Sequence, residues 1–269
     1  MRPSIIKWTL ISLCVLFIVI MLILPLATVI VYALRQGWET FRDAVLDEYA
    51  VKALKLTLLS AVLAVSVNTF FGLFASWAIT KFHFRGKQIL TTLIDIPFSI
   101  SPVIGGLVFI LIFGRIGWAY PFLTAHGVKI VFAVPGIVLA TIFVTFPFVS
   151  RELIPLMQSQ GKEEEEAAAL MGASGFHIYR KITLPHIKWG LLYGVILCSA
   201  RAIGEFGAVS VVSGHLRGKT NTLPLHVEIL FNEFNLTAAC AVSSILVFLA
   251  VVILILRNIA EFRVKKETR

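Results

Sequence analysis

Six long apolar runs, separated by short polar connections, constrain the fold of this chain more than any other feature. They cover approximately residues 10–34, 56–79, 89–113, 130–149, 187–212 and 238–256. A helix needs roughly 20 apolar residues to cross the hydrocarbon core of a bilayer, and each run reaches that length. The backbone must satisfy its own hydrogen bonds in lipid, so segments of this length cross as helices. The sequence therefore predicts an all-α, polytopic bundle of about six transmembrane helices, forming a single domain over residues 1–269.

The composition agrees with a protein embedded in a lipid bilayer. Hydrophobic residues make up 58% of the chain and charged residues 14%, whereas soluble domains carry about 25% charged residues. The net charge of +9 would suit nucleic-acid binding, but the basic residues flank the apolar runs, as membrane topology requires. We therefore expect no nucleic-acid partner.

The distribution of basic residues predicts the orientation. With the N-terminus inside, the inner segments hold fifteen Lys and Arg residues and the outer segments eight. The inner residues nearest the ends are Arg2, Arg263, Lys265, Lys266 and Arg269. Positive charge favours the cytoplasmic side, so we expect a multi-pass protein of the cytoplasmic (inner) membrane with both termini in the cytoplasm.

The longest polar interruption runs from Glu163 to Pro185, within a predicted cytoplasmic loop at 150–186. Its first half consists of strong helix formers, with acidic residues in the first turn, where the helix dipole favours them. Gly172 suits the left-handed residue that closes a helix, and Ser174 can cap a second helix. Pro185, which lacks a backbone N–H, is expected to mark the end of that second helix. The segment therefore predicts a helix-turn-helix elbow.

The elbow also carries a family pattern. The sequence fills every position of EAA(x3)G(x9)IxLP, with Glu166, Ala167, Ala168, Gly172, Ile182, Leu184 and Pro185. It thus resembles the cytoplasmic EAA loop of permeases of ATP-binding-cassette (ABC) importers. The resemblance implies that the elbow docks into a cleft on a separate ATPase subunit and couples its motion to the membrane. The alternative is an amphipathic hairpin at the membrane surface with no partner.

The resemblance extends over residues 95–239 and indicates a substrate class. The tracts Pro135–Thr145, Val149–Pro155 and Ser199–Gly214 are similar to bacterial sulfate/thiosulfate permeases. Leu216–Thr220, followed by Leu223–Leu225 and Glu228, is similar to the W-type of the two permease chains rather than the T-type. This implies a heterodimer with a T-type chain, two ATPase subunits and an extracytoplasmic sulfate-binding protein. Molybdate and tungstate permeases share the Arg201–Gly207 tract, so a homodimeric permease of that kind is the alternative.

Arg201 and Glu205 are candidates for the translocation pathway. They lie near the middle of the predicted fifth span, one turn apart, and so share a helix face. Each charge costs about 2.5–3.5 kcal/mol at the bilayer centre, which disfavours a lipid-facing position. We expect each to pair with the other or with a neighbouring helix. The pair could line the pathway, or serve only as a structural ion pair.

The third run contributes the other pathway candidates, Asp95, Ser99 and Ser101. Pro97 and Pro102 break its ladder of backbone hydrogen bonds, and such a break survives in lipid only where protein or water satisfies the freed groups. We expect this helix to face the bundle interior. Asp95 either lines the pathway or is a solvated carboxylate near the helix end.

The sequence predicts no nucleotide-binding, metal or catalytic site in this chain. Gly214–Thr220 ends like a phosphate-binding loop, but the pattern GxxxxGK[ST] needs Gly at position 213, which is Ser. The six histidines show no spacing that suggests a metal site or a catalytic triad. Cys14, Cys198 and Cys240 fall inside apolar runs and are expected to be buried thiols.

We therefore expect no catalytic or metal residues, no enzyme activity and no cofactor in this chain. The resemblance places ATP and Mg on the partner ATPase. Two other classes remain as alternatives: a secondary transporter or channel, and an intramembrane enzyme built from Asp95, Glu205 and the histidines.

Overall fold

The structure is a computed structural model that describes residues 3–267, with side chains described for residues 6–261. Throughout the described backbone, helices are joined by turns and no strand occurs, as the six apolar runs predict. Of the basic residues used to predict the orientation, Arg2, Arg263, Lys265, Lys266 and Arg269 lie outside the described side chains.

Within the described part of the chain, five continuous helical segments are long and apolar enough to cross a membrane: Ile6–Leu34, Glu48–Lys81, Val134–Ser159, Gly175–Ile203 and Leu236–Glu261. The first comprises α1 (Pro3–Ile18), a π-helical turn η1 (Val19–Ile23) and α2 (Leu24–Leu34); the second is α4 (Glu48–Lys81). The third joins α8 (Val134–Thr145) to α9 (Pro147–Ser159), and the last belongs to α15 (Leu236–Glu267). The fourth joins α11 (Gly175–Ile178), the π-turn η2 (Tyr179–Thr183) and α12 (Leu184–Ile203).

The predicted third span, 89–113, is not one straight helix. It consists of α5 (Lys87–Ser99) and α6 (Pro102–Phe113), which are bent by 107° relative to one another. Ser101 has an extended ψ of 134° because the residue before a proline is excluded from helical geometry. Pro102 then starts α6, whereas Pro97 remains inside α5. The two prolines thus have different effects.

The predicted fifth span, 187–212, is also interrupted. Helix α12 ends at Ile203 with Gly204 as its C-cap, and a separate helix, α13 (Gly207–Ser213), follows. Gly204 disfavours helix continuation, and the Glu205 carboxylate accepts from the N–H of Ala208 at 2.8 Å. Arg201 therefore lies in the last turn of α12, where the predicted span is interrupted, rather than inside one continuous helix.

The prediction that Pro185 ends the second elbow helix was wrong as well. The helical segment continues from Gly175 through η2 into α12, with Pro185 in the first turn of α12. Pro185 removes one backbone N–H from this continuous helix, and the π-turn η2 is the irregular segment directly before it. The elbow is thus joined to the bundle by continuous helix.

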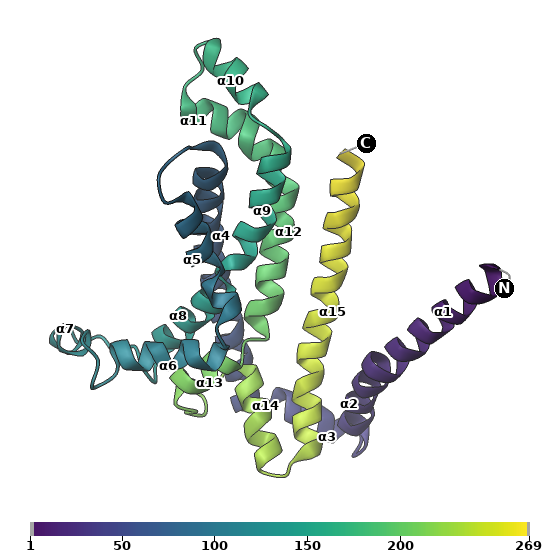
Figure 1. The fold of residues 1–269 in the computed structure, drawn as a ribbon. Helices are drawn as coiled ribbons and strands as arrows, with labels where there is room; N and C mark the ends of the chain where they lie inside the picture. The colour runs from purple at the N-terminus through teal and green to yellow at the C-terminus, as the bar shows by residue number, and fades with distance from the viewer. Residues whose placement is uncertain (1–2, 268–269) are drawn as a thin grey trace.

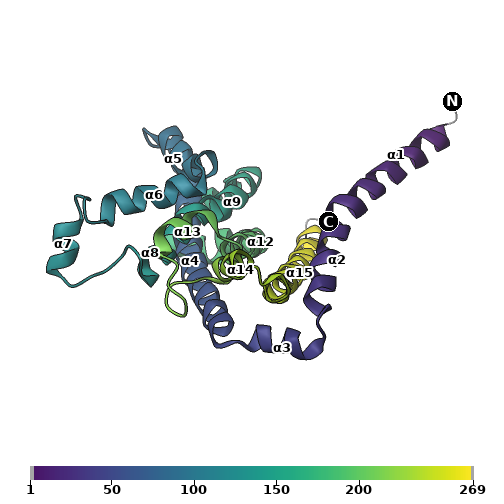
Figure 2. The ribbon, with the colours of Figure 1, turned by 90° about the horizontal axis from the view of Figure 1, so that it is seen from below.

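Short helices lie at both ends of the bundle (Figure 1). The elbow helices α10 (Glu163–Leu170) and α11 project at one end, which is also where α15 ends. At the opposite end lie α3 (Trp38–Leu46) and α14 (Leu223–Asn232). The remaining short helix, α7 (Tyr120–Ala125), extends sideways beyond α6 (Figure 2).

The core lies where α4, α9 and α12 pack together. Val149 and Leu153 of α9 are buried against Ile187 and Cys198 of α12. Asn68 of α4 is fully buried, and its amide donates to the Thr145 hydroxyl at 2.8 Å and the Ile142 carbonyl at 3.1 Å. A Cβ on Gly194 would lie 3.3 Å from the Cα of Val149, which confirms that glycine lets α12 approach its neighbour closely.

The first span is set apart from this core. Helix α1 diverges from the bundle, whereas α2 packs against α15 (Figure 2). In the most apolar part of the first span, no residue is buried within the chain. Cys14 is exposed, so the prediction of a buried thiol there was wrong. Cys198 is buried and Cys240 is partly buried. Apolar sequence predicts removal from water, which lipid provides as well as protein does.

We predict that Gly106→Ala destabilises the protein, because a Cβ there would lie 2.5 Å from the Ala208 carbonyl oxygen of α13. Forcing α6 away from α13 should lower the free energy of unfolding by about 1–3 kcal/mol. Gly175→Ala is the control, since a Cβ there meets nothing within 4 Å. Thermal unfolding in detergent measures both; equal stabilities would contradict the packing.

Candidate functional site

The elbow has the predicted helix-turn-helix geometry. Gly172 adopts φ +86° between α10 and α11, in the left-handed region that favours glycine. The Ser174 hydroxyl accepts from the His177 N–H at 3.4 Å, and so caps α11. The N–H of Ala173 donates to the Ala168 carbonyl at 3.1 Å, which closes the turn. The local structure predicted for Gly172 and Ser174 is confirmed.

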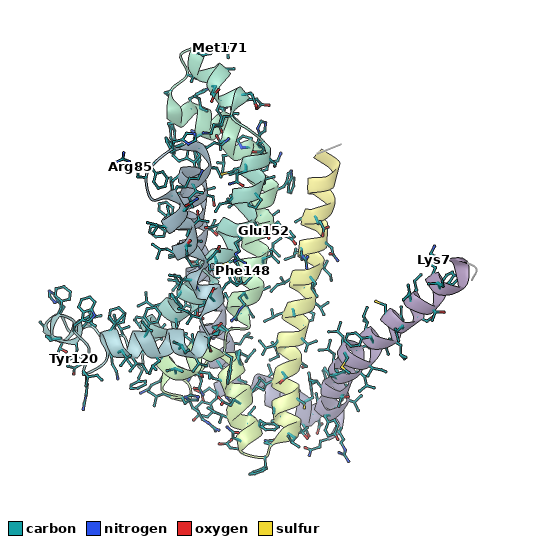
Figure 3. The ribbon with its side chains drawn as sticks, in the orientation of Figure 1. Lys7, Arg85, Tyr120, Phe148, Glu152 and Met171 are labelled. Atoms are coloured by element: carbon teal, nitrogen blue, oxygen red, sulfur yellow. The ribbon has the colours of Figure 1, made fainter. Side chains whose placement is uncertain are left out.

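The tip of the elbow is apolar and exposed. Leu170 is 90% exposed, Met171 83% and Phe176 74%, and Met171 lies at the outermost point (Figure 3). We call these three residues the apolar tip. Exposed apolar groups beyond the bundle indicate an interaction surface. The sequence reasoning overlooked them, although they lie next to the turn glycine of the EAA pattern.

The seven EAA positions occupy different environments. Glu166, Ala167, Gly172 and Pro185 are exposed, Ile182 and Leu184 are half-buried, and Ala168 is only 7% exposed. Glu166 and Ala167 are therefore accessible to another chain. Ala168, in contrast, packs inside the elbow.

Glu165, which precedes the EAA pattern, makes the contacts that hold the elbow to the bundle. Its Oε1 lies 3.1 Å from Nζ of Lys81, the last residue of α4, and accepts from the Thr183 hydroxyl at 2.6 Å. The sequence reasoning missed this residue. The available signal was a lysine ending the second span, before a long acidic run.

Arg201 and Glu205 pair with each other, one of the two arrangements that the sequence left open, at the junction of α12 and α13. Arg201 Nη1 lies 2.6 Å from Glu205 Oε2, and the Glu205 side chain is 1% exposed against 33% for Arg201. Because the other Glu205 oxygen caps α13, this one carboxylate holds the start of α13 and the end of α12 together.

The broken third and fifth spans meet each other. A Cβ on Gly207 would lie 3.0 Å from the Pro102 Cβ, so the start of α13 packs against the start of α6. Ser101 and Ser99, at the α5–α6 bend, are exposed within this chain. The structure therefore brings the α5–α6 bend next to the junction that contains Arg201 and Glu205.

Asp95 has a partner that the sequence reasoning did not name. Its Oδ1 lies 2.8 Å from Nε of Arg151 on α9, and the two side chains are 38% and 51% exposed. The Arg151 guanidinium also lies 4.2 Å from the ring centroid of Phe98. These contacts give Asp95 a role in joining α5 to α9.

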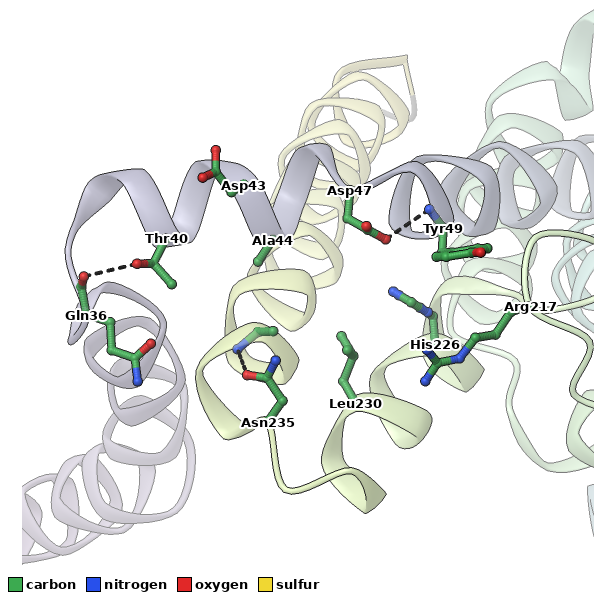
Figure 4. A pocket seen from close by; sticks show the side chains of 11 residues that line it. Gln36, Thr40, Asp43, Ala44, Asp47, Tyr49, Arg217, His226, Leu230 and Asn235 are labelled. Atoms are coloured by element: carbon green, nitrogen blue, oxygen red, sulfur yellow. Dashed lines mark hydrogen bonds between the residues drawn. The ribbon is translucent and has the colours of Figure 1, made fainter.

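A pocket of about 510 Å³ lies at the end of the bundle opposite the elbow, between α3, α14 and the starts of α4 and α15 (Figure 4). Asp47 caps α4, accepting from the N–H groups of Tyr49 at 2.9 Å and Ala50 at 3.2 Å. Burial lowers the pKa of His226 below its usual value, although nearby Asp47 opposes that shift. The imidazole is consequently neutral at pH 7, and Asp47 is mainly engaged in capping.

The bundle combines helices long enough to cross a membrane with a bent third span and a projecting elbow (Figure 1). Residues 68–266 match the model of the family described as binding-protein-dependent transport system inner membrane component. The chain belongs to this family, and is accordingly a multi-pass membrane permease subunit rather than an enzyme.

Individual relatives narrow the comparison. The chain is 44% identical to the sulfate transport system permease protein CysW of Escherichia coli (strain K12), covering 98% of this chain and 90% of that protein. It is 33% identical to the sulfate transport system permease protein CysT of Salmonella typhimurium (strain LT2), covering 92% and 90%. The resemblance to the W-type chain is confirmed.

Solved structures agree on the fold. A bacterial ABC transporter that imports the acidic polysaccharide alginate contains a chain that matches with a TM-score of 0.80. The match covers 100% of this chain and 98% of that chain at 17% sequence identity. At that identity the likeness concerns the fold alone.

We predict that Arg201→Ala is more destabilising than Arg201→Ala combined with Glu205→Gln. The single change leaves a buried carboxylate without its partner, which typically costs about 3–5 kcal/mol. Gln retains an oxygen that can cap α13 but carries no charge. Thermal unfolding in detergent distinguishes the variants; if the double variant is no more stable than the single one, the carboxylate does not depend on Arg201.

Proposed function

We propose that this chain is the W-type permease subunit of an ABC importer that carries sulfate or thiosulfate across the cytoplasmic membrane. The observation that carries this proposal is the 44% identity to CysW over 98% of the chain, within a family of binding-protein-dependent transporters. The homodimeric molybdate or tungstate permease is not favoured, because the relatives named above are sulfate permeases.

In this proposal the elbow docks into a cleft on a separate ATPase subunit. The apolar tip gives the elbow a surface that gains by burial. Exposed Glu166 lies on α10, one turn before Leu170, and is available to a basic residue of the ATPase. The projection of Met171 beyond the bundle supports this docking (Figure 3).

The remaining partners follow from the proposed importer. A T-type permease chain forms the other half of the membrane unit, consistent with the similarity to CysT. Two ATPase subunits bind and hydrolyse ATP with Mg, and this chain contributes no residue to that chemistry. An extracytoplasmic sulfate-binding protein delivers the anion to the end of the bundle opposite the elbow.

The proposed orientation places both termini and the elbow in the cytoplasm. The excess of Lys and Arg in the inner segments supports this. So does the arrangement of the helices, because α15 ends at the same end of the bundle as the elbow (Figure 1). The ATPase and the elbow then meet on one side.

We place the translocation pathway beside the junction of α12 and α13. A tetrahedral dianion crosses a low-dielectric region only if positive charge and hydrogen-bond donors offset its desolvation. Arg201, which is 33% exposed, can supply such charge. Glu205 reduces the net charge, so the site does not become a tight anion trap. Asp95, Ser99 and Ser101 belong to the adjoining α5–α6 unit and complete the proposed lining.

Uptake of labelled sulfate tests the substrate. Cells that lack this chain should lose sulfate uptake, and restoring the chain should recover it, with excess molybdate competing only weakly. Arg201→Ala and Glu205→Ala, introduced separately, should lower uptake and sulfate-stimulated ATP hydrolysis. Unchanged sulfate uptake on deletion, accompanied by lost molybdate accumulation, would transfer the substrate to the alternative.

We predict that Gly172→Val weakens recruitment of the ATPase subunit. A β-branched residue at φ +86° is strained by about 1–3 kcal/mol, so the elbow turn should not hold its geometry. Gly175→Val is the matched control, because Gly175 lies outside the left-handed region and faces open space. Copurification of the ATPase with each variant measures docking; normal recruitment by Gly172→Val would refute the docking model.

A further inference from the structure

We propose that Glu165 is a positioning residue that fixes the elbow to α4 through Lys81. Through this contact, displacement of the elbow by the ATPase would move α4 together with α12. This inference rests on the proposed docking function of the elbow. Glu165 thereby has a role different from that of the adjacent Glu166, which is the first residue of the EAA pattern.

The contacts of Lys81 provide the first step. Its Nζ lies 3.1 Å from Glu165 Oε1, and the two side chains are 8% and 17% exposed. The same ammonium donates to the Gly161 carbonyl at 2.7 Å. In return, the ammonium of Lys162 donates to the Lys81 carbonyl at 2.9 Å. The last residue of α4 is therefore held through both its side chain and its backbone by the chain that enters the elbow.

Glu165 also reaches the second leg of the elbow. Its Oε1 accepts from the hydroxyl of Thr183, which is 2% exposed and lies in the π-turn η2. One carboxylate oxygen thus joins α4, α10 and the segment that leads into α12. We call Lys81, Glu165 and Thr183 the elbow clamp.

The elbow clamp resists relative movement of α4 and the elbow. A buried ion pair resists sliding, because separating its members leaves unpaired charges in a poorly solvated place. Beside it lies a hollow of about 260 Å³, lined by residues that include Trp77, Lys81, Glu165 and Tyr179. The rings of Trp77 and Tyr179 touch at a centroid distance of 4.9 Å. The polar link and this ring contact together join α4 to the second leg of the elbow.

The other three glutamates of the run Glu163–Glu166 are exposed and form no ion pair with Lys81. Glu163, Glu164 and Glu166 are exposed, and Glu164 meets His186 at 3.4 Å with its side chain 70% exposed. Glu165 is turned inward by the helical period of α10. The run therefore presents separate surfaces: Glu166 toward a docking partner, and Glu165 toward α4.

Movement of Lys81 could be transmitted along the whole length of α4. Helix α4 is continuous over 34 residues, so it spans about 50 Å at the usual rise per residue. Its other end, capped by Asp47, borders the outer pocket. The elbow clamp would thus connect the ATPase side to the face that receives the binding protein.

The test uses the full complex, reconstituted in liposomes with the T-type chain, the ATPase subunits and the sulfate-binding protein. The readout is ATP hydrolysis with and without sulfate-loaded binding protein, together with copurification of the ATPase. Glu165→Gln should retain copurification but lower the stimulated-to-basal ratio about tenfold, within the usual range of coupling between sites. Glu164→Gln, which neutralises an exposed neighbour, should leave that ratio unchanged.

A double-mutant cycle with Lys81→Met separates positioning from general structure. If Lys81 and Glu165 act through one contact, the double variant should lose no more coupling than the worse single variant. Additive losses would overturn the proposal, as would a normal ratio in Glu165→Gln. Lost copurification in Glu165→Gln would also overturn it, because Glu165 would then belong to docking. If the wild-type chain itself recruits no ATPase, the proposed function fails instead.

Discussion

The need of a membrane-embedded backbone to satisfy its own hydrogen bonds underlies this structure. Long helices meet that need without help, but the third and fifth spans break at Ser101 and Gly204. Such breaks persist only where protein or a water-filled cavity receives the freed backbone groups. Here the helices that follow the breaks pack together, with Gly207 close to Pro102, while Ser101 and Gly204 themselves are exposed within this chain. Irregular backbone is thus concentrated in one place, and the Arg201–Glu205 pair lies there.

A largely buried carboxylate joins separate segments at two places in the bundle, the α12–α13 junction and the elbow. At the helix junction, Glu205 is almost completely buried and depends on a single arginine and one backbone N–H. At the elbow, Glu165 shares one oxygen between Lys81 and Thr183. In both places a carboxylate joins segments that are separate in the sequence or in the helix ladder. Relative movement of those segments therefore has an electrostatic cost, which suits a subunit that passes through defined conformations.

The elbow projects from one end of the bundle, so the two ends of the molecule differ (Figure 1). Its turn depends on Gly172, its cap on Ser174, and its tip exposes Leu170, Met171 and Phe176. Since the core of α4, α9 and α12 is complete without these residues, the tip is free to serve a contact with another chain. The exposed first span is a second surface left uncovered by this chain, and lipid or another subunit is its natural environment.

The sequence by itself determined the all-α fold, the approximate spans, the elbow turn at Gly172, the family and the placement of Arg201 and Glu205 one turn apart. These features depend on local periodicity, on glycine and proline geometry, or on residues one turn apart. Only the tertiary structure decided the 107° bend, the continuation of helix through Pro185, the Asp95–Arg151 pair and the burial of Glu165 against Lys81. The two ion pairs depend on which helices lie side by side, and a proline by itself does not decide between a bend, as at Pro102, and a continuing helix, as at Pro185. An apolar run records that a helix enters the membrane, but not which neighbour it meets there.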